Sequence, residues 1–153
     1  MYGPKTRFVT PDGDLAFDEV KEDESFIVLT HTGAMKRAVV VRGDKREMRL
    51  LTIVRGGMKA QLLVDKDHRM IHFNDIMNMP ALGELVEDMH MMRSPSRFMW
   101  IDGEYCQVLW NGDDTPELCW RVESIAEGGT SEAWTLKVEQ MGTFSLAEGI
   151  IVN

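Results

Sequence analysis

The sequence has few of the features that mark several large classes of protein. It has 2 cysteines, Cys106 and Cys119, which are in no CxxC pair and have no ligand-like spacing, so a reduced intracellular protein is favoured over a disulfide scaffold. No apolar run approaches the length of a membrane span. Lys and Arg (17) are outnumbered by Asp and Glu (25), giving a net charge of −8. A nucleic-acid backbone is therefore disfavoured as the main partner, since phosphate binding needs clustered basic residues.

The remaining composition is that of a soluble globular protein. Hydrophobic residues make up 44% of the chain and charged residues 27%, and 153 residues suffice to bury a core in one domain. The charged, proline-containing start does not resemble a signal peptide. We expect one domain over residues 1–153, monomeric and cytoplasmic, with no membrane or nucleic-acid partner.

Short apolar runs separated by Gly, Asp and Asn residues predict a mainly β fold. Strands are expected at 7–9, 26–30, 35–41, 48–54, 59–64, 98–101, 105–110, 118–125, 133–138 and 150–152. Gly43-Asp44 should separate two of them, and Asp102-Gly103 is the strongest hairpin signal. The glycine pairs Gly56-Gly57 and Gly128-Gly129 are expected between strands, so neither is a phosphate-binding loop before a helix. One short helix is indicated by apolar residues at helical spacing, which we interpret as core: Leu82, Leu85, Val86 and Met89.

The densest group of chemically capable side chains follows the apolar run that ends at Val64. It comprises Asp65, Asp67 and His68, and an imidazole oriented by a carboxylate can act as a general acid or base. A metal site that adds His72 is disfavoured, because the intervening residues look strand-like and no third ligand has convincing spacing. The simplest alternative is a solvated turn. No nucleophile elbow for serine catalysis occurs in the sequence.

The two ends of the chain carry further signals. Met1 is followed by Thr6 and, after a short strand, by the turn Asp12-Gly13. The last residue is Asn153, whose side-chain amide could attack its own carbonyl and cut the following peptide bond if another segment came after it. The apolar run before it reads Gly-Ile-Ile-Val.

These three separated segments, taken in order, resemble those of an intein, the self-splicing form of the Hint fold. Inteins open with a nucleophilic Cys and a Thr five positions later, as at Met1 and Thr6. They continue with an apolar strand and Thr-x-x-His, which Asp65 to His68 resembles, and close on Gly-Ile-Ile-Val-His-Asn. The resemblance implies a compact, pseudo-symmetric Hint fold that brings both ends beside His68. About fifty residues between the His68 segment and the late strands are too few for a homing endonuclease domain, so a mini-intein is expected.

The sequence departs from the family pattern at five positions. Met1 occupies the nucleophile slot, and its thioether cannot form a thiolate. Asp65 replaces the Thr of the His68 segment. The family's late-strand Asp and the His that follows it correspond to Thr135 and Gly142, and Val152 replaces the penultimate His.

The resemblance implies an autocatalytic, single-turnover reaction. An acyl shift at residue 1, transfer to the residue after Asn153 and cyclisation of Asn153 would excise the domain and join the flanks. The partners would be flanking segments in cis, or in trans if the chain is split, and no cofactor would be needed. Met1 would block the first step. Two alternatives stay open: a Hint relative that cleaves without ligating, and a non-catalytic β-rich binding module.

Overall fold

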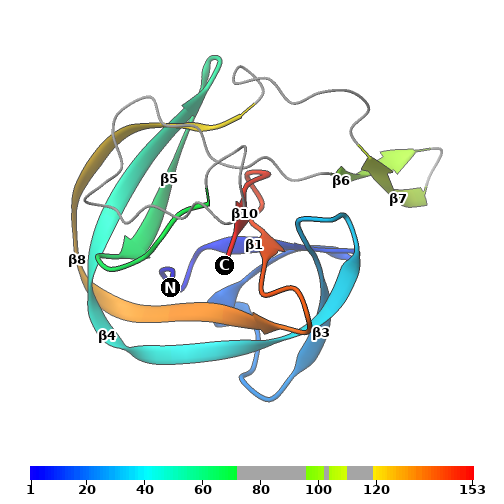
Figure 1. Cartoon of the computed structure of the whole chain (residues 1–153), viewed down its shortest axis with the longest axis horizontal. Helices are drawn as coiled ribbons and strands as arrows, with labels where there is room; N and C mark the ends of the chain where they lie inside the picture. Colours follow the sequence, from blue (N-terminus) through cyan, green and yellow to red (C-terminus); the bar gives the residue numbers. More distant parts are fainter. Residues whose placement is uncertain (72–95, 102–103, 110–118) are drawn as a thin grey trace.

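The computed structural model describes residues 1–71, 96–101, 104–109 and 119–153. Strands dominate the described chain, as the short apolar runs between turn residues predict (Figure 1). The strands are β1 (Arg7–Thr10), β2 (Gly13–Ala16), β3 (Ser25–Leu29), β4 (Met35–Arg55), β5 (Met58–Asp65), β6 (Ser96–Ile101), β7 (Glu104–Leu109), β8 (Arg121–Val138), β9 (Phe144–Ser145) and β10 (Ile151–Val152). A single 3₁₀ turn in the described chain, η1, covers Phe17–Glu19. The expected helix around Leu82 lies outside the described residues.

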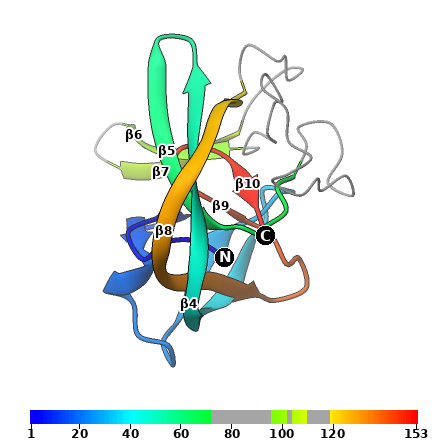
Figure 2. The ribbon, with the colours of Figure 1, turned by 90° about the vertical axis from the view of Figure 1, so that its left-hand side faces the viewer.

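Two long strands form the frame of the molecule. β4 pairs antiparallel with β8 along most of its length, and β3 and β5 pair with the two ends of β4 (Figures 1 and 2). The predicted break at Gly43-Asp44 is therefore wrong, because β4 runs through it and accommodates one extra residue as a register shift between Arg42 and Lys45. A β-bulge of this kind bends a strand without ending it.

The expected position of the second glycine pair, between strands, is also wrong. Gly128 and Gly129 lie inside β8 at a second register shift, where β8 carries one residue more than β4 between Glu47 and Arg49. Gly129 has φ +71, and a Cβ built on Gly128 would lie 2.7 Å from a Leu63 methyl carbon and 2.9 Å from the Met48 carbonyl carbon. Glycine therefore permits the bulge at one position and the close approach of β5 and β4 at the other.

The short hairpins follow the turn residues more closely. β4 and β5 are joined by Gly56-Gly57, with Arg55 opposite Met58. β6 and β7 pair with each other as a hairpin, with Ile101 opposite Glu104. The strands flanking Asp102-Gly103 are thus confirmed, while those two residues themselves lie outside the described chain.

A cluster of aromatic rings lies at the centre of the core. Phe17 is 5.2 Å from the Phe8 ring centroid and 6.2 Å from that of Tyr2, and Phe144 lies 6.1 Å from Tyr2. All four side chains are fully buried. These rings join β1, η1 and β9 to the N-terminal residues, so burial of apolar area fixes the N-terminal segment inside the fold.

The two ends of the chain lie side by side. Both views place the N and C labels together near the middle of the molecule (Figures 1 and 2). The described residues contain no helix that is long and apolar enough to span a membrane.

Candidate functional site

The site begins where β5 ends in a tight turn. The backbone N–H of His68 donates to the Asp65 carbonyl at 3.1 Å, and the N–H of Asp67 donates to Asp65 Oδ1 at 2.9 Å. Asp is favoured at the first position of such turns because its carboxylate accepts from the backbone two residues on. The turn places the side chains of Asp65 and His68 in the interior, where the two residues are 4% and 8% exposed.

The first residues of the chain are held between β5 and β8. Tyr2 exchanges two backbone hydrogen bonds with Trp134, at 2.7 and 2.8 Å, and the Gly3 N–H donates to the Leu63 carbonyl at 2.8 Å. A Cβ on Gly3 would lie 2.8 Å from Leu63 Cδ2, so the Leu63 side chain would have to move. The N-terminal segment is thus fixed by main-chain bonds on both sides.

This pairing brings the nitrogen of residue 1 to the turn. The Met1 α-amino group donates to Asp65 Oδ2 at 2.7 Å and lies 2.9 Å from His68 Nδ1. The Met1 carbonyl accepts from the Asp65 N–H at 3.0 Å. The approach of residue 1 to His68 that the family resemblance implied is observed.

The other nitrogen of the His68 ring faces a buried phenol. Tyr2 Oη lies 2.7 Å from His68 Nε2, and the two rings meet edge to face at 4.7 Å. Met1, His68 and Tyr2 therefore form a hydrogen-bonded chain through both imidazole nitrogens.

Burial sets the protonation states of this chain of groups. Burial lowers the pKa of the His68 imidazole to about 3, helped by the ammonium of Met1 and opposed by Asp65, so the ring is neutral at pH 7. Burial raises the pKa of the Tyr2 phenol well above its ordinary value, and the charge of Asp65 acts in the same direction.

The carboxylate and the amine are shifted by competing effects. Burial raises the pKa of Asp65, but the hydrogen bond and charge of the N-terminus outweigh it, so the pKa lies below its ordinary value. For the Met1 amine, burial lowers the pKa and the hydrogen bond to Asp65 opposes this shift incompletely. A buried carboxylate thus stays ionised beside a neutral imidazole.

A polar recess opens next to Asp65. Its volume is about 290 Å³, and Arg46, Glu47, Lys66 and Asp67 complete its lining. The Arg46 guanidinium lies 3.7 Å from Asp65 Oδ2 and is half-exposed. Arg46 therefore offers Asp65 a second cation besides the ammonium of residue 1.

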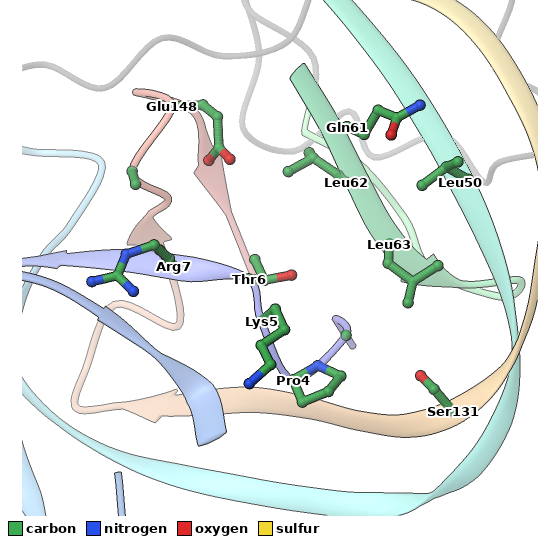
Figure 3. A pocket seen from close by; sticks show the side chains of 12 residues that line it. Pro4, Lys5, Thr6, Arg7, Leu50, Gln61, Leu62, Leu63, Ser131 and Glu148 are labelled. Atoms are coloured by element: carbon green, nitrogen blue, oxygen red, sulfur yellow. The ribbon is translucent and has the colours of Figure 1, made fainter. Parts of the chain in front are cut away.

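Thr6 lies in a different place. It lines a cavity of about 440 Å³ between β1, β5 and the segment before β10, and Figure 3 shows its hydroxyl on the side that faces β5. In the described chain Thr6 shares no hydrogen bond with Asp65 or His68; its backbone bonds join it to Gly3 and Phe17. One oxygen of Glu148, which also lines this cavity, is buried without a hydrogen-bond partner among the described residues, and burial raises the pKa of that carboxyl.

Thr135 and Gly142, the two positions expected from the late strand, lie in β8 and in the turn after it. Thr135 is half-buried in β8, opposite Val41 of β4. Gly142 lies in the exposed turn after β8 with φ +67, where a Cβ would have nothing within 4 Å of it. The next residue, Thr143, bonds to the His31 ring at 2.8 Å.

The last two residues differ sharply in exposure. Val152 pairs with Phe144 and is fully buried in the same core cluster as Tyr2. Asn153 follows β10 and is exposed. A hydrophobic residue at position 152 therefore fixes the end of the chain by packing, and its side chain has no proton to give.

Acidic, cysteine and histidine side chains do not gather into a group of three that could hold a metal ion within residues 1–71, 96–101, 104–109 and 119–153. His72, which entered the metal alternative, lies outside the described chain. Cys119 is a buried thiol in the core.

Tyr2 and Arg46 are the site residues that sequence reasoning missed. An aromatic residue directly after the residue-1 slot was the available signal for Tyr2. Arg46 lies between the expected strands 35–41 and 48–54, and its place beside Asp65 depends on the continuous β4.

The fold is similar to that of solved mini-inteins over nearly its whole length. The gp41-1 intein has a TM-score of 0.68 at 15% identity, covering 99% of this chain and 96% of its own. The DnaB intein from Synechocystis has a TM-score of 0.69 at 14% identity, covering 99% of this chain and 96% of its own. The DnaX mini-intein from Spirulina platensis reaches 0.64 at 14% identity, covering 99% and 98%.

Sequence comparison adds nothing to this likeness, because no protein-family model and no curated protein matches the chain. At an identity near 15%, the likeness shows the fold alone. The chemistry has to be inferred from the residues of the site. The chain therefore has the Hint fold of the mini-inteins.

Proposed function

We propose that this chain is a protein-splicing domain whose first step is blocked by Met1, and that it folds as one domain over residues 1–153. The observation that supports this most directly is the position of the residue-1 nitrogen, in contact with both Asp65 and His68. If a segment is fused before Met1, this atom becomes the nitrogen of the peptide bond at the junction. The same atom would be the leaving group in N-terminal cleavage.

The contacts give each residue a role in that step. With Cys at position 1, its sulfur would attack the preceding carbonyl carbon, forming a thioester and breaking the bond to the residue-1 nitrogen. The residue-1 nitrogen would take the proton of His68 Nδ1, which lies 2.9 Å away, and the proton lost by the thiol would replace it on the ring, so the step leaves no net charge. Asp65 would hold the nitrogen in place.

Met1 cannot perform this step, since a thioether has no proton to lose and makes a poor nucleophile. The remaining reaction is at the other end. The Asn153 amide nitrogen would attack the Asn153 carbonyl carbon, closing a succinimide and releasing the amine of the following residue. In the chain as it stands, we therefore expect at most cleavage after Asn153.

Thr135, Gly142 and Val152 occupy slots at which the family carries assisting groups, and none of the three supplies a titratable side chain. Cyclisation of Asn153 should consequently be slow. The flanking segments are the partners of the reaction, and acyl and proton transfers within one folded chain need no cofactor.

Flanked fusions test the proposal at the C-terminal junction. Two reporter domains are fused before Met1 and after Asn153, with Cys directly following Asn153, and products are followed by mass spectrometry. We expect slow release of the downstream reporter, abolished by Asn153→Ala, which removes the cyclising amide. Release that continues in Asn153→Ala would contradict the assignment, whereas a substitution at an exposed position outside the site, such as Asp23→Asn, should leave release unchanged.

A further inference from the structure

The hydroxyl of Tyr2 has no part in the acyl transfer steps, yet it contacts their central imidazole. Tyr2 Oη is 2.7 Å from His68 Nε2, and the Tyr2 side chain is fully buried. Its backbone is fixed to Trp134 and its ring is packed against Phe17 and Phe144. The phenol is therefore held at the ring nitrogen that faces away from residue 1.

A neutral imidazole carries one proton, and the partner of one nitrogen decides where it sits. To deliver a proton to the residue-1 nitrogen, His68 must carry it on Nδ1. Nε2 then has a lone pair that needs a donor, and in this buried place the Tyr2 hydroxyl supplies one.

The free N-terminus needs the opposite arrangement. An ammonium group at Met1 donates to Nδ1, which must then be the acceptor, so the ring proton lies on Nε2. Tyr2 satisfies this state as well, because a hydroxyl can accept as readily as it donates. A phenylalanine ring of the same shape could do neither.

We propose that Tyr2 is a positioning residue that sets the tautomer of His68. While residue 1 is part of a peptide bond, the Tyr2 hydroxyl donates to Nε2 and the ring proton lies on Nδ1. Once residue 1 is an ammonium, the hydroxyl accepts from Nε2–H. Its relevance to cleavage rests on the proposed splicing function. The charged and titratable groups that face this chain of atoms are Asp65, the Met1 amine and Arg46. Asp65 takes the single N–H of a peptide nitrogen, which leaves Nδ1 free to be the donor.

The tautomer can be read without any cleavage. A flank fused before Met1 gives a chain that cannot undergo the first step, and ring-nitrogen NMR locates the proton of His68, assigned by loss of its signals in His68→Gln. We expect the proton on Nδ1 in the flanked chain and on Nε2 at pH 6 in the chain with a free N-terminus. A proton on Nε2 in the flanked chain would overturn the proposal, and this measurement needs no change at Tyr2.

A substitution then tests the hydroxyl itself. Tyr2→Phe should abolish the Nδ1 preference in the flanked chain; an unchanged tautomer would overturn the proposal. In a flanked Met1→Cys chain, Tyr2→Phe should slow thiol-induced cleavage before residue 1 by about tenfold or more, at the lower end of general acid–base effects. Phe144→Leu, which loosens packing on the Tyr2 ring but keeps the hydroxyl, should lower the unfolding midpoint and leave the tautomer in place.

The two readouts separate this proposal from the proposed function. If the flanked Met1→Cys chain is inert while the tautomer depends on Tyr2, splicing fails and the positioning role of Tyr2 stands. If cleavage proceeds at the same rate in Tyr2→Phe, the positioning role fails and splicing stands.

Discussion

The nitrogen of residue 1 is the central atom of the site, because it contacts both Asp65 and His68. It contacts a carboxylate and an imidazole that are both buried, and it is the atom whose chemistry changes when a peptide bond is made or broken there. The ammonium suits Asp65, since a buried carboxylate is stabilised by a charged donor. A peptide nitrogen offers Asp65 one neutral N–H instead.

This difference predicts a coupling between the state of residue 1 and Asp65. Asp65→Asn should cost more unfolding free energy when the N-terminus is free than when a short neutral flank precedes Met1, by about 1 kcal/mol or more. Urea unfolding of the four proteins at pH 7 measures it. Equal costs in both backgrounds would show that Asp65 does not distinguish ammonium from amide, and Asp23→Asn, at an exposed position outside the site, serves as the control with no coupling.

The lowered pKa of His68 predicts how the free energy of unfolding depends on pH. Its pKa of about 3 in the folded chain lies below the ordinary 6.5, so the unfolded chain binds a proton that the folded chain does not. The contribution of the neutral His68 to the free energy of unfolding is complete above pH 6.5. It is lost as the pH falls toward 3, by up to about 1.4 kcal/mol per pH unit, because the unfolded chain takes up the proton first. Unfolding measured between pH 6.5 and 4.5 should show a flatter slope in His68→Gln. The same slope in both proteins would contradict a buried neutral imidazole.

At the scale of the elements, the bulges in β4 and β8 explain why the sequence pattern failed there. Short apolar runs bounded by turn residues predict strands well at 26–30 and 59–64, where the pairing is regular. Gly43 and Gly128 look like turn residues in a single sequence. Their actual role is close approach, because Cβ atoms would meet Met1 Cε at 2.8 Å and Leu63 Cδ1 at 2.7 Å. Such contacts between distant segments leave no local signal.

The close approach at Gly128 has a measurable cost. Gly128→Ala should destabilise the fold by roughly 1–3 kcal/mol, the usual range for overpacking, since part of the crowding comes from the β4 backbone. Gly57→Ala is the matched control, with nothing within 4 Å of its Cβ. Thermal unfolding compares them, and equal midpoints would show that β8 does not approach β4 as described.

The last strand makes a related prediction for position 152. The family's His in this slot suggests that Val152→His could speed Asn153 cyclisation, but Val152 is fully buried against Phe144. An imidazole there should overpack the core and destabilise the fold by roughly 1–3 kcal/mol. Glu139→His, at an exposed position, should cost little. A folded Val152→His chain of unchanged stability would show that β10 has room that the packing does not suggest.

At the scale of the whole molecule, the sequence was informative about the segments that meet at the site. The mainly β fold, the turn at Asp65 and the approach of residue 1 to His68 could be predicted, because they depend on local turn residues and on segments that resemble a known family. Tyr2 and Arg46 could not, since each acquires its role from contacts across the fold. The catalytic roles assigned to Thr6, Thr135 and Gly142 stay predictions, and the side chain of Thr6 lines a separate cavity.

The central claim is that a thiol at residue 1 would restore the first step in an otherwise competent site. The direct test is mass spectrometry of flanked Met1→Cys and unchanged flanked chains after addition of a small thiol. We expect the upstream flank to be released from Met1→Cys as its thiol ester and to stay attached in the chain with Met1, with release slowed about a hundredfold or more by His68→Ala. A folded, soluble Met1→Cys chain that keeps its upstream flank would contradict the account and favour a non-catalytic binding module.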